Sequence, residues 1–355
     1  RNGDEFIENA INNGAKAIFV EKEKAQTLRE NFPSECVVFC VENTREALRT
    51  LAAYRHAKLS LEKTIGITGS VGKTTTKNLL QKLLSSRYPS FSPRESFNTP
   101  IGIDLALASV PKETKVLILE FGAYSFGEIR ELTLQYMPEI GVLTDIAPAH
   151  TQGFSSLKGV LQAKLEILES PRMEAIFFNA DSPLLASFFS TASLNHQTPI
   201  PVGWSADPSR GIRIERAEVS FNAEEAYPFS LQLNLSLRGK RLSCRAPFYC
   251  THHAYACGFV LGIAQTMGIP LSQKTDSFFE NFQVPPGRGN ILRSSSGCLL
   301  FDESYNANPK SMGSSLSNFG RLPFSGRKVV LLGGMKELGE LSSKEHLHIL
   351  SFFAP

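Results

Sequence analysis

Apolar runs that end in polar residues recur along the chain from residue 61 onward. They are Thr64–Thr68, Val116–Glu120, Ile140–Asp145, Ala175–Asn179, Cys298–Asp302 and Lys328–Leu332. Helical patterns separate several of these runs, and this alternation is typical of an α/β protein with a mostly parallel, doubly wound sheet. Ligands of such sheets bind beyond the carboxyl ends of the strands, so the polar residues that close the runs are candidates for a functional site.

Two other stretches follow different patterns. Residues 1–60 mix short helix and strand signals, which we predict at Asp4–Asn13, Ala17–Val20, Cys36–Val41 and Thr44–Lys58. Residues 212–245 alternate between apolar and polar positions, which indicates an insertion of antiparallel strands. Pro285–Gly287 marks a turn, and residues 317–327 read as a linker to a further unit. The patterns divide the chain into residues 1–60, 61–318 and 319–355.

A glycine-rich segment joins the strand predicted at Thr64–Thr68 to a helix predicted at Lys73–Ser86. Its sequence Gly-x-x-Gly-Lys-Thr is typical of a phosphate-binding loop, in which backbone N–H groups surround the phosphates of a nucleotide. The loop residues are Gly69, Ser70, Val71, Gly72, Lys73, Thr74 and Thr75. We expect Lys73 to reach the β- and γ-phosphates and Thr74 to hold Mg²⁺, at a helix N-terminus whose dipole favours anions. The alternative, a glycine turn before a helix, requires no ligand.

Composition excludes several classes of function. The 355 residues carry a formal net charge of +3 and are 42% hydrophobic and 20% charged, which fits a globular protein and gives no case for binding nucleic acid or a membrane surface. No apolar run approaches the length of a membrane-spanning helix. The cysteines form no C-x-x-C pair, so we expect free thiols in a reducing compartment and no zinc site. The chain begins at Arg1 without a signal-peptide pattern and reads as a fragment that begins inside a fold.

Three further side chains could take part in chemistry at the carboxyl edge of the sheet. Glu120 closes a buried run and could share a magnesium ion with the phosphates, although a strand-end glutamate can also be a solvated terminus. His150 follows the run Ile140–Asp145, and a lone histidine is often structural. Lys164 lies on a helix predicted at Leu157–Leu168, where a solvated lysine is the simpler interpretation. Each residue is a weak signal alone, and their order after the loop is the stronger signal.

The order of these motifs resembles that of the Mur ligase family, and most closely that of its D-alanyl-D-alanine-adding (MurF-type) members. The segments that carry the resemblance are Thr68–Lys77 (the family's shorter loop, without a glycine at Ile67), Ser96–Gly102, Glu120–Ala123, Gly127–Ile129, Ala149–His150, Gln162–Glu166 and Asp302–Pro309. The last is the most specific, because the diamino-acid-adding relatives differ there. The resemblance implies that residues 1–60 are the remainder of a UDP-sugar-binding domain, 61–318 the central ATP-binding ligase domain, and 319–355 the start of a Rossmann-like C-terminal domain.

The resemblance also implies roles for individual residues. Lys73 and Thr74 would hold the β/γ-phosphates of ATP and a first Mg²⁺, whose shell Glu120 would complete. His150 and a carbamoylated Lys164 would hold a second Mg²⁺ near the acyl acceptor, because a carbamate offers the anionic oxygen that Mg²⁺ prefers to an ammonium group. On the nucleotide side of the cleft the resemblance places Arg288, Asp302, Asn306 and, toward adenine, His253.

The implied activity is that of a cytoplasmic, ATP-dependent ligase of peptidoglycan precursor synthesis, with a part in cell-wall biogenesis, cell shape and division. It would join UDP-N-acetylmuramoyl-tripeptide to D-alanyl-D-alanine through an acyl phosphate, which turns a poor acyl donor into a reactive one. We expect these small molecules as its partners, with no nucleic acid, no membrane insertion and a monomeric state. Two alternatives stay open: a related ligase that adds another amino acid, and a degenerate homologue that binds nucleotide without catalysis.

Departures from the family's pattern motivate the second alternative. Tyr124 and Ser125 stand where the family has Asn-His, and Gly334 replaces the aspartate of a Gly-Asp-Met motif. The adenine-side motif His-Asn-x-x-Asn has His253 and Ala256 in place of its asparagines. An asparagine amide offers donors and an acceptor to a base edge, whereas a neutral histidine offers one of each and alanine offers none. The departures therefore concern recognition of the base more than phosphate chemistry.

Overall fold

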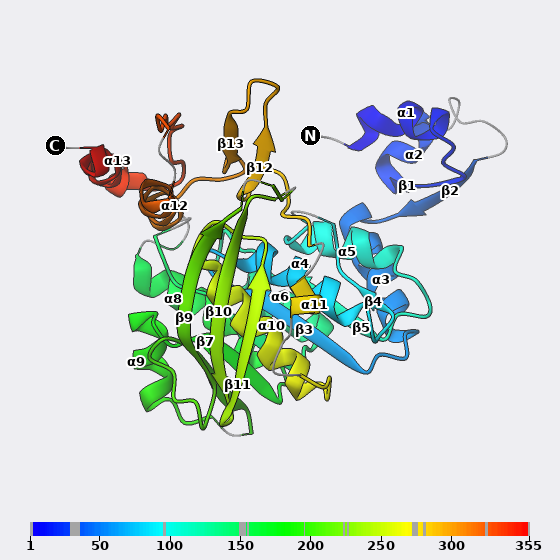
Figure 1. Cartoon of the computed structure of the whole chain (residues 1–355). Coiled ribbons are helices and arrows are strands. Elements are labelled where there is room, and N and C mark those ends of the chain that lie inside the picture. The colour runs from blue at the N-terminus through cyan, green and yellow to red at the C-terminus, as the bar shows by residue number, and fades with distance from the viewer. Residues whose placement is uncertain are drawn as a thin grey trace.

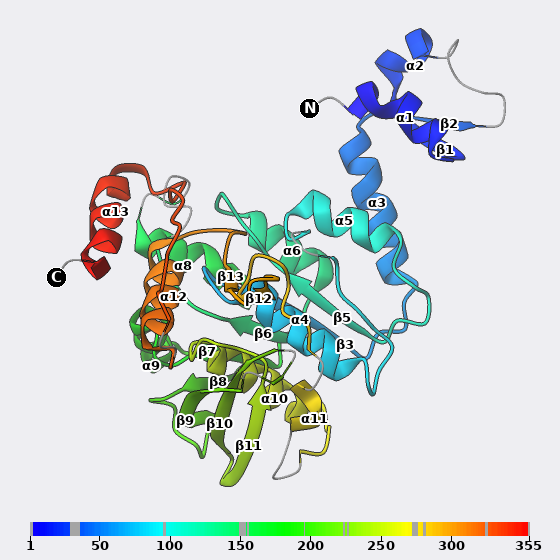
Figure 2. The same cartoon turned by 45° about the horizontal axis from the view of Figure 1, so that its top comes forward.

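The protein consists of a large central body with a small lobe at its N-terminal end and a helical segment at its C-terminal end (Figures 1 and 2). The computed structural model describes residues 3–28, 36–94, 97–148, 154, 156–194, 196–222, 224–225, 227–271, 276–279, 282–323 and 326–353. Within these ranges, no helix is both long and apolar enough to cross a membrane. The lobe and the C-terminal segment lie on opposite sides of the body.

A nine-stranded sheet forms the middle of the central body, in the order β11-β10-β9-β8-β7-β6-β3-β5-β4. Its strands are β3 (Lys63–Thr68), β4 (Ser90–Phe91), β5 (Val116–Glu120), β6 (Ile140–Leu143), β7 (Ala175–Asn179), β8 (Thr198–Gly203), β9 (Ile212–Phe221), β10 (Phe229–Leu237) and β11 (Lys240–Ala246). Neighbouring strands from β4 to β9 run parallel, and β9, β10 and β11 pair in antiparallel fashion. The prediction of a mostly parallel α/β sheet is confirmed. The antiparallel strands predicted within residues 212–245 extend the same sheet at one edge.

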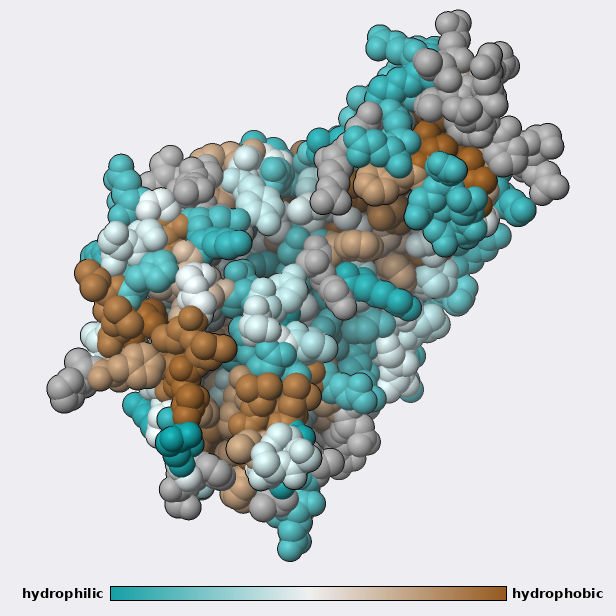
Figure 3. Space-filling view, turned by 90° about the horizontal axis from the view of Figure 1, so that it is seen from above, coloured by the Kyte–Doolittle hydropathy of each residue, from teal (hydrophilic) through white to brown (hydrophobic). Residues whose placement is uncertain are grey.

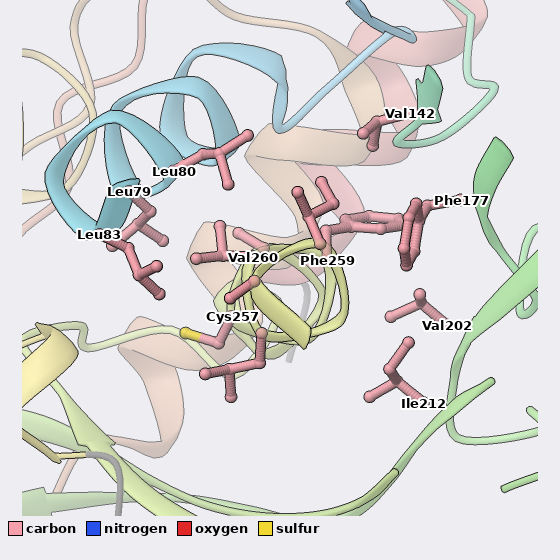
Figure 4. Packing of buried hydrophobic residues seen from close by; sticks show 14 of the residues in the cluster. Leu79, Leu80, Leu83, Val142, Phe177, Val202, Ile212, Cys257, Phe259 and Val260 are labelled. Atoms are coloured by element: carbon pink, nitrogen blue, oxygen red, sulfur yellow. The ribbon is translucent and has the colours of Figure 1, made fainter. Parts of the chain in front are cut away.

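Helices cover both faces of this sheet. α4 (Lys73–Leu84) and α10 (His253–Thr266) pack on one face, where Figure 4 shows Val260 on the side of α4 and Phe259 on the side of β7. The other face is covered by α5 (Pro100–Ala108), α6 (Glu128–Tyr136), α8 (Leu157–Leu165) and α9 (Pro183–Thr191). Because side chains of a strand point alternately to its two faces, neighbouring residues of β5 belong to different cores. Burial on both faces explains why these strands read as continuous apolar runs.

The N-terminal lobe contains a two-stranded parallel sheet and short helices. Its elements are η1 (Gly3–Phe6), α1 (Ile7–Asn12), β1 (Ala17–Glu21), α2 (Lys22–Leu28), β2 (Val37–Val41) and α3 (Thr44–Ala57). The helix α3 leads from the lobe to the central body and packs there against α5. Its Ala52 is fully buried, and the Arg55 guanidinium donates to the Val110 carbonyl at 2.6 and 3.0 Å. The helix α3 that joins the two parts is therefore anchored on the body, and it matches the helix predicted at Thr44–Lys58 to within one residue.

The C-terminal third contains a hairpin and several helices. These elements are α11 (Asp276–Phe279), β12 (Asn290–Arg293), β13 (Leu299–Asp302), α12 (Pro309–Arg321), η4 (Gly339–Leu341), α13 (Ser342–Leu350) and η5 (Ser351–Phe353), and a further short helix, η3 (Glu166–Glu169), continues α8. The strand predicted at Cys298–Asp302 forms, but its prediction as part of the parallel sheet is wrong, because β13 pairs with β12 in a separate antiparallel hairpin. Residues 317–321, predicted as linker, are the last turn of α12.

The strand predicted at Lys328–Leu332 is absent from the structure. The segment has no regular secondary structure, and no strand among the described residues pairs with it. An apolar run specifies a strand only where a neighbouring strand can accept its hydrogen bonds, and this segment instead leaves Val329 and Leu331 68% and 99% exposed. Hydrophobic side chains gather at this end of the molecule in the view from above (Figure 3).

Candidate phosphate-binding and catalytic site

The glycine-rich loop, residues 69–72, lies at a switch point of the sheet. It follows β3, which pairs with β5 on one side and with β6 on the other. The connections between strands therefore run in opposite directions from this point, which leaves a crevice at the carboxyl ends of the strands. Gly72 has φ = 84° and begins α4, and Gly69 has φ = 139°. A Cβ atom on Gly69 would lie 2.1 Å from the Thr144 hydroxyl and 2.9 Å from the Asp145 amide nitrogen. The loop therefore requires glycine both for its backbone angles and for its closeness to the strand end.

The segment after β6 supports the loop through hydrogen bonds. The Ser70 N–H donates to the Asp145 carbonyl at 2.8 Å, and the Thr144 hydroxyl donates to the Val71 carbonyl at 2.6 Å. The Ser70 hydroxyl also exchanges hydrogen bonds of 3.0 Å with the backbone of Ala147. Thr144 and Asp145 were not predicted as loop supports, and their place directly after a strand was the one signal that could have indicated this role.

The two residues that follow the glycines lie beside a buried carboxylate. The Lys73 ammonium donates to the Gly69 carbonyl at 2.8 Å, and the Thr74 hydroxyl donates to a carboxylate oxygen of Glu120 at 2.8 Å. The other oxygen of Glu120 accepts from the Asn98 amide at 3.0 Å, and the Glu120 residue is 2% exposed. Burial lowers the pKa of Lys73, an effect that Glu120 opposes and the nearby charge of Arg288 reinforces. The structure thus brings Lys73, Thr74 and Glu120 together, with Asn98 as a further partner.

Lys164 is buried at the end of α8, close to this group. Burial lowers the pKa of Lys164 to about 7, and the charge of Lys73 adds to the shift while Glu128, Glu166 and Glu120 oppose it. The ammonium nitrogen lies 5.7 Å from the centroid of the Phe154 ring. Burial therefore favours the neutral amine of Lys164 far more than in a solvated lysine. His150, the other residue assigned to this part of the site, lies outside the described residues.

The acidic motif around Gly127 is tied to the segment that carries Lys164. The Glu166 carboxylate accepts from the N–H groups of Gly127 at 2.8 Å and Arg130 at 3.0 Å, in the first turn of α6. A carboxylate at this position satisfies free N–H groups and interacts favourably with the helix dipole. Glu128 accepts from the Tyr124 N–H at 2.8 Å. Helices α6 and α8 are thereby fixed relative to one another around Lys164.

A turn of the C-terminal third directs Arg288 toward the loop. The Arg288 guanidinium lies over the Tyr305 ring, 3.8 Å from its centroid, and its charge acts on Lys73. The Asp302 carboxylate accepts from the N–H groups of Ser304 and Gly287, both at 3.0 Å, and the hydrogen bonds from Ser304 contribute most to lowering its pKa. Asp302 therefore shapes the turn that carries Arg288. Asn306 is exposed, and its side chain accepts from the next residue's N–H at 2.9 Å.

His253 is turned into the protein core. Its ring stacks on Phe248 with centroids 4.1 Å apart and planes at 10°, and the residue is 6% exposed. Burial lowers the pKa of His253 well below its usual range, and His252, 4.2 Å away between ring centroids, adds to the shift. The pKa of His252 is lowered by burial to about 4, and its ring meets the Ser314 hydroxyl at 3.0 Å. Both histidines are neutral at pH 7 and are held by aromatic packing and neutral hydrogen bonds.

The chemistry of the donor set around the loop fits Mg²⁺. The Thr74 hydroxyl and the Glu120 carboxylate are hard oxygen donors in direct contact. Among the described residues, no group of three or more His, Cys, Asp or Glu side chains could hold a metal ion. A cation at Thr74 and Glu120 would thus take its other ligands from phosphates and water, which is how Mg²⁺ is usually held in nucleotide sites.

Comparisons with known proteins give a consistent result. The profile of the Mur ligase middle domain matches residues 67–256. The UDP-N-acetylmuramoyl-tripeptide–D-alanyl-D-alanine ligase of Bacillus subtilis is 28% identical over 99% of this chain and 72% of its own length. The ligase of the same name from Rickettsia prowazekii is 29% identical over 99% of this chain and 75% of its own.

Solved structures of similar proteins have the same fold. A crystal structure of MurF from Acinetobacter baumannii matches with a TM-score of 0.80 and 26% identity, over 97% of this chain and 71% of that one. The MurF ligase of Thermotoga maritima in complex with ADP matches with a TM-score of 0.80 and 25% identity, over 99% of this chain and 76% of that one.

Proposed function

Since this chain belongs to the Mur ligase family, we propose that it is an ATP-dependent ligase that joins UDP-N-acetylmuramoyl-tripeptide to D-alanyl-D-alanine. The relatives from Bacillus subtilis and Rickettsia prowazekii carry the name of this activity, and the similar MurF structure from Thermotoga maritima contains ADP. The same proposal assigns residues 1–60 to recognition of the UDP-sugar, 61–318 to ATP binding and catalysis, and 319–355 to the domain that completes the cleft.

One observation carries the proposal: a buried lysine, Lys164, lies in the electrostatic neighbourhood of the phosphate-binding loop. The charge of Lys73 lowers the pKa of Lys164, and the charge of Glu120 raises the pKa of both lysines. A loop that only binds nucleotide has no need of a second, desolvated lysine. A ligase that transfers a phosphoryl group to a carboxylate does need a site beside the γ-phosphate for the acyl group.

The neutral form of Lys164 is suited to carbamoylation. Carbon dioxide adds to a neutral amine and not to an ammonium group, and loss of a proton from nitrogen then leaves an anionic carbamate. A pKa of about 7 provides the neutral amine at physiological pH. The carbamate would reverse the charge of Lys164 beside Lys73, which relieves the repulsion between the two amines. We therefore propose that a second Mg²⁺ would be bound by the carbamate of Lys164 and by the ring of His150.

In the first half of the reaction, the residues of the loop stabilise the negative charge of the phosphoryl group that is transferred. The substrate carboxylate attacks the γ-phosphate, the β–γ bridge oxygen leaves with ADP, and an acyl phosphate forms. Lys73 donates from its ammonium to the transferring phosphoryl oxygens, and the loop N–H groups hold the β-phosphate in place. Arg288, held over Tyr305, adds positive charge on the nucleotide side. Mg²⁺, when bound by Thr74 and Glu120, supplies further charge neutralisation.

The second half of the reaction forms the peptide bond. The amine of D-alanyl-D-alanine attacks the acyl carbon, the carbon–oxygen bond to phosphate breaks, and the amine proton is lost. The departing phosphate is again opposite Lys73. Exclusion of water would protect the acyl phosphate from hydrolysis, and the burial of Lys164 supports a desolvated site for this chemistry.

The test is phosphate release by the complete protein from ATP and Mg²⁺. Release that requires both UDP-muramoyl tripeptide and D-alanyl-D-alanine is the expected result. A panel of other amine acceptors distinguishes ligases that add a different amino acid. Nucleotide binding without any acceptor-dependent release would contradict the proposal and favour a non-catalytic homologue, the alternative that the replacement of both adenine-side asparagines motivates.

A further inference from the structure

One face of α12 carries three polar residues that contact the central body. Lys310, Ser314 and Asn318 are spaced four residues apart and therefore lie on the same side of the helix. The opposite side carries Met312 and Leu316, which pack against the apolar cluster of residues 335, 338 and 349. The helix α12 is thus the element between the central body and the C-terminal segment, residues 326–353.

The first of these contacts reaches the segment that supports the phosphate loop. The Lys310 ammonium forms an ion pair with the Asp145 carboxylate, whose side chain is 6% exposed while that of Lys310 is 47% exposed. The other oxygen of Asp145 accepts from the Ile146 N–H at 2.8 Å. The backbone carbonyl of the same residue accepts from the Ser70 N–H at 2.8 Å. Asp145 therefore joins α12 through its side chain to the loop through its backbone.

The start of α12 is fixed where Lys310 leaves it. Asn308 caps the helix by accepting from the Ser311 N–H at 2.9 Å, and the Ser311 hydroxyl in return meets the Asn308 N–H at 3.2 Å. Pro309 occupies the first turn, where its missing N–H costs nothing. The backbone of Lys310 is therefore fixed by the capped first turn of α12.

The other two contacts hold the far turns of α12 to the start of α10. The Ser314 hydroxyl meets the His252 ring at 3.0 Å, and the Asn318 side-chain oxygen accepts from the N–H and the hydroxyl of Thr251, both at 3.1 Å. These partners are neutral, so the Lys310–Asp145 pair is the charged contact in the row. The helix α12 spans the distance between the loop support and the beginning of α10.

We propose that Lys310 and Asp145 are positioning residues that couple α12 to the phosphate loop. The placement of α12 and the shape of the loop then depend on one another, so that bound nucleotide favours the docked position of α12 and a docked α12 favours nucleotide binding. This reciprocity is a thermodynamic requirement of any such coupling. The inference rests on the proposed nucleotide site, and it adds two residues for which neither the sequence motifs nor the ligase reaction assigns a role.

The burial of Asp145 makes the pair sensitive to the loss of one partner. A carboxylate that is nearly excluded from water and loses its counter-charge must be exposed again or be protonated. Exposure of the carboxylate would move the segment of residues 144–147, which holds Ser70 and Val71 by hydrogen bonds. Replacing both partners by neutral residues of similar shape removes the coupling but leaves no isolated charge.

A double-mutant cycle on the complete protein tests the coupling. The variants are Asp145→Asn, which keeps the oxygen that accepts from Ile146, Lys310→Met, which keeps the aliphatic stem, and the two together. We expect Lys310→Met to weaken binding of a non-hydrolysable ATP analogue with Mg²⁺ by about tenfold, and the double variant to bind no more weakly than the worse single variant. Lys310→Arg should restore most of the affinity, because it keeps the charge. Lys344→Met, at an exposed position of α13, is the matched control and should bind as the wild type does.

The outcomes separate the coupling from the proposed function. Failure of the wild type to bind the analogue would refute the nucleotide site itself. Tight binding by the wild type and by all three variants would refute the coupling alone, as would losses of affinity in the two single variants that multiply in the double variant. A lowered midpoint of thermal unfolding with unchanged affinity would show that the pair only stabilises the fold. An increase in the KM for ATP with an unchanged kcat is the kinetic signature of the coupling.

Discussion

The polar side chains of the phosphate loop and those at the start of α10, the two ends of the proposed nucleotide site, differ in their surroundings. At the loop, the Thr74 hydroxyl contacts Glu120 and the Lys73 ammonium contacts the Gly69 carbonyl, beside the place where phosphates would lie. At the start of α10, His253 is stacked on Phe248 inside the core. The loop has polar groups available for a ligand. At the start of α10, by contrast, the polar side chain of His253 packs against an aromatic ring.

The difference indicates which parts of a ligand require fixed residue types. Stabilising a phosphoryl group in transfer requires a cation, a hydroxyl and N–H groups in one geometry, and few residues can replace them. A purine base offers hydrogen-bonding edges and two apolar faces, so several kinds of side chain can hold it. The sequence retains the family's pattern at the first end and departs from it at the second. We therefore expect substitutions at the loop to have large effects and those at His253 to have small ones.

The largest effect is expected for Lys73→Ala. Loss of the ammonium removes the charge that opposes the γ-phosphate in the transition state, and we expect kcat/KM for ATP to fall by about 10³-fold. Acceptor-dependent phosphate release measures this. Circular dichroism should be unchanged and the midpoint of thermal unfolding should not fall, because Lys73 makes one hydrogen bond in a loop that the Thr144 segment holds independently, and burial of its ammonium opposes folding. If the activity of Lys73→Ala were within tenfold of that of the wild type, the expected difference between the phosphate loop and the His253 end would be contradicted.

The next effect concerns Lys164, whose buried amine opposes folding. Its pKa is about 7 in the folded protein and 10.5 in the unfolded chain. Below pH 7 both states are charged and the folded state carries the full cost of burial, which is relieved as the pH rises from 7 to 10.5. We expect Lys164→Met to be more stable than the wild type by a few kcal/mol at pH 6 in buffer free of carbon dioxide, and the gap to narrow to under about 1 kcal/mol at pH 10.

Urea unfolding of both proteins at pH 6 and pH 10 measures this gap. The variant should lose activity at the same time, as expected where a strained group serves catalysis. Added bicarbonate should raise the activity of the wild type near pH 6.5 and leave the variant unchanged. A stability difference that is the same at both pH values would show that the charge of Lys164 is not its cause.

Sequence patterns predicted the loop well because its determinants are local. The strand Thr64–Thr68, the glycines and the helix from Lys73 follow one another directly, and their geometry depends on neighbouring residues. The contacts that shape the loop from outside were not predictable, because Thr144 and Asp145 reach it only through the order of strands in the sheet. Lys310 is more distant still, at 165 residues from its partner.

The wrong predictions have a related physical cause. Apolar content alone indicated strands at Cys298–Asp302 and Lys328–Leu332, but a strand is defined by the partner that accepts its hydrogen bonds. The first run found a partner in β12 rather than in the main sheet, and the second found none among the residues that the structure describes. His253 was predicted to contact adenine because of its place in a sequence motif. The motif could not indicate that Phe248 stacks on the His253 ring.

A smaller effect at the loop is expected for Glu120→Gln. The substitution keeps the shape and an acceptor for the Thr74 hydroxyl but removes the negative charge that would attract Mg²⁺. We expect about a 10²-fold loss of kcat, partly restored by raising the concentration of Mg²⁺. Titration of activity with Mg²⁺ measures both effects. Lys82→Gln, at an exposed position of α4, serves as a control for a change of one charge, and it should leave the Mg²⁺ dependence unchanged. A Glu120→Gln variant with the wild-type Mg²⁺ dependence would exclude Glu120 from the ion's shell.

The smallest effect is expected for His253→Phe, at the other end of the edge. The variant keeps an aromatic ring against Phe248, so we expect the KM for ATP to change by about threefold or less, which corresponds to under 1 kcal/mol. Its clearer effect should be on acid stability. The pKa of His253 is lowered by burial, so the unfolded chain binds a proton below pH 6.5 that the folded protein does not, and the wild type loses stability as the pH falls from there. Phenylalanine cannot take up this proton, and the variant should therefore lose less stability between pH 6.5 and 4.5 in urea unfolding. The exposed His348, replaced in the same way, should leave the acid profile unchanged. A large increase in the KM for ATP would place His253 in contact with the nucleotide and make the two ends alike.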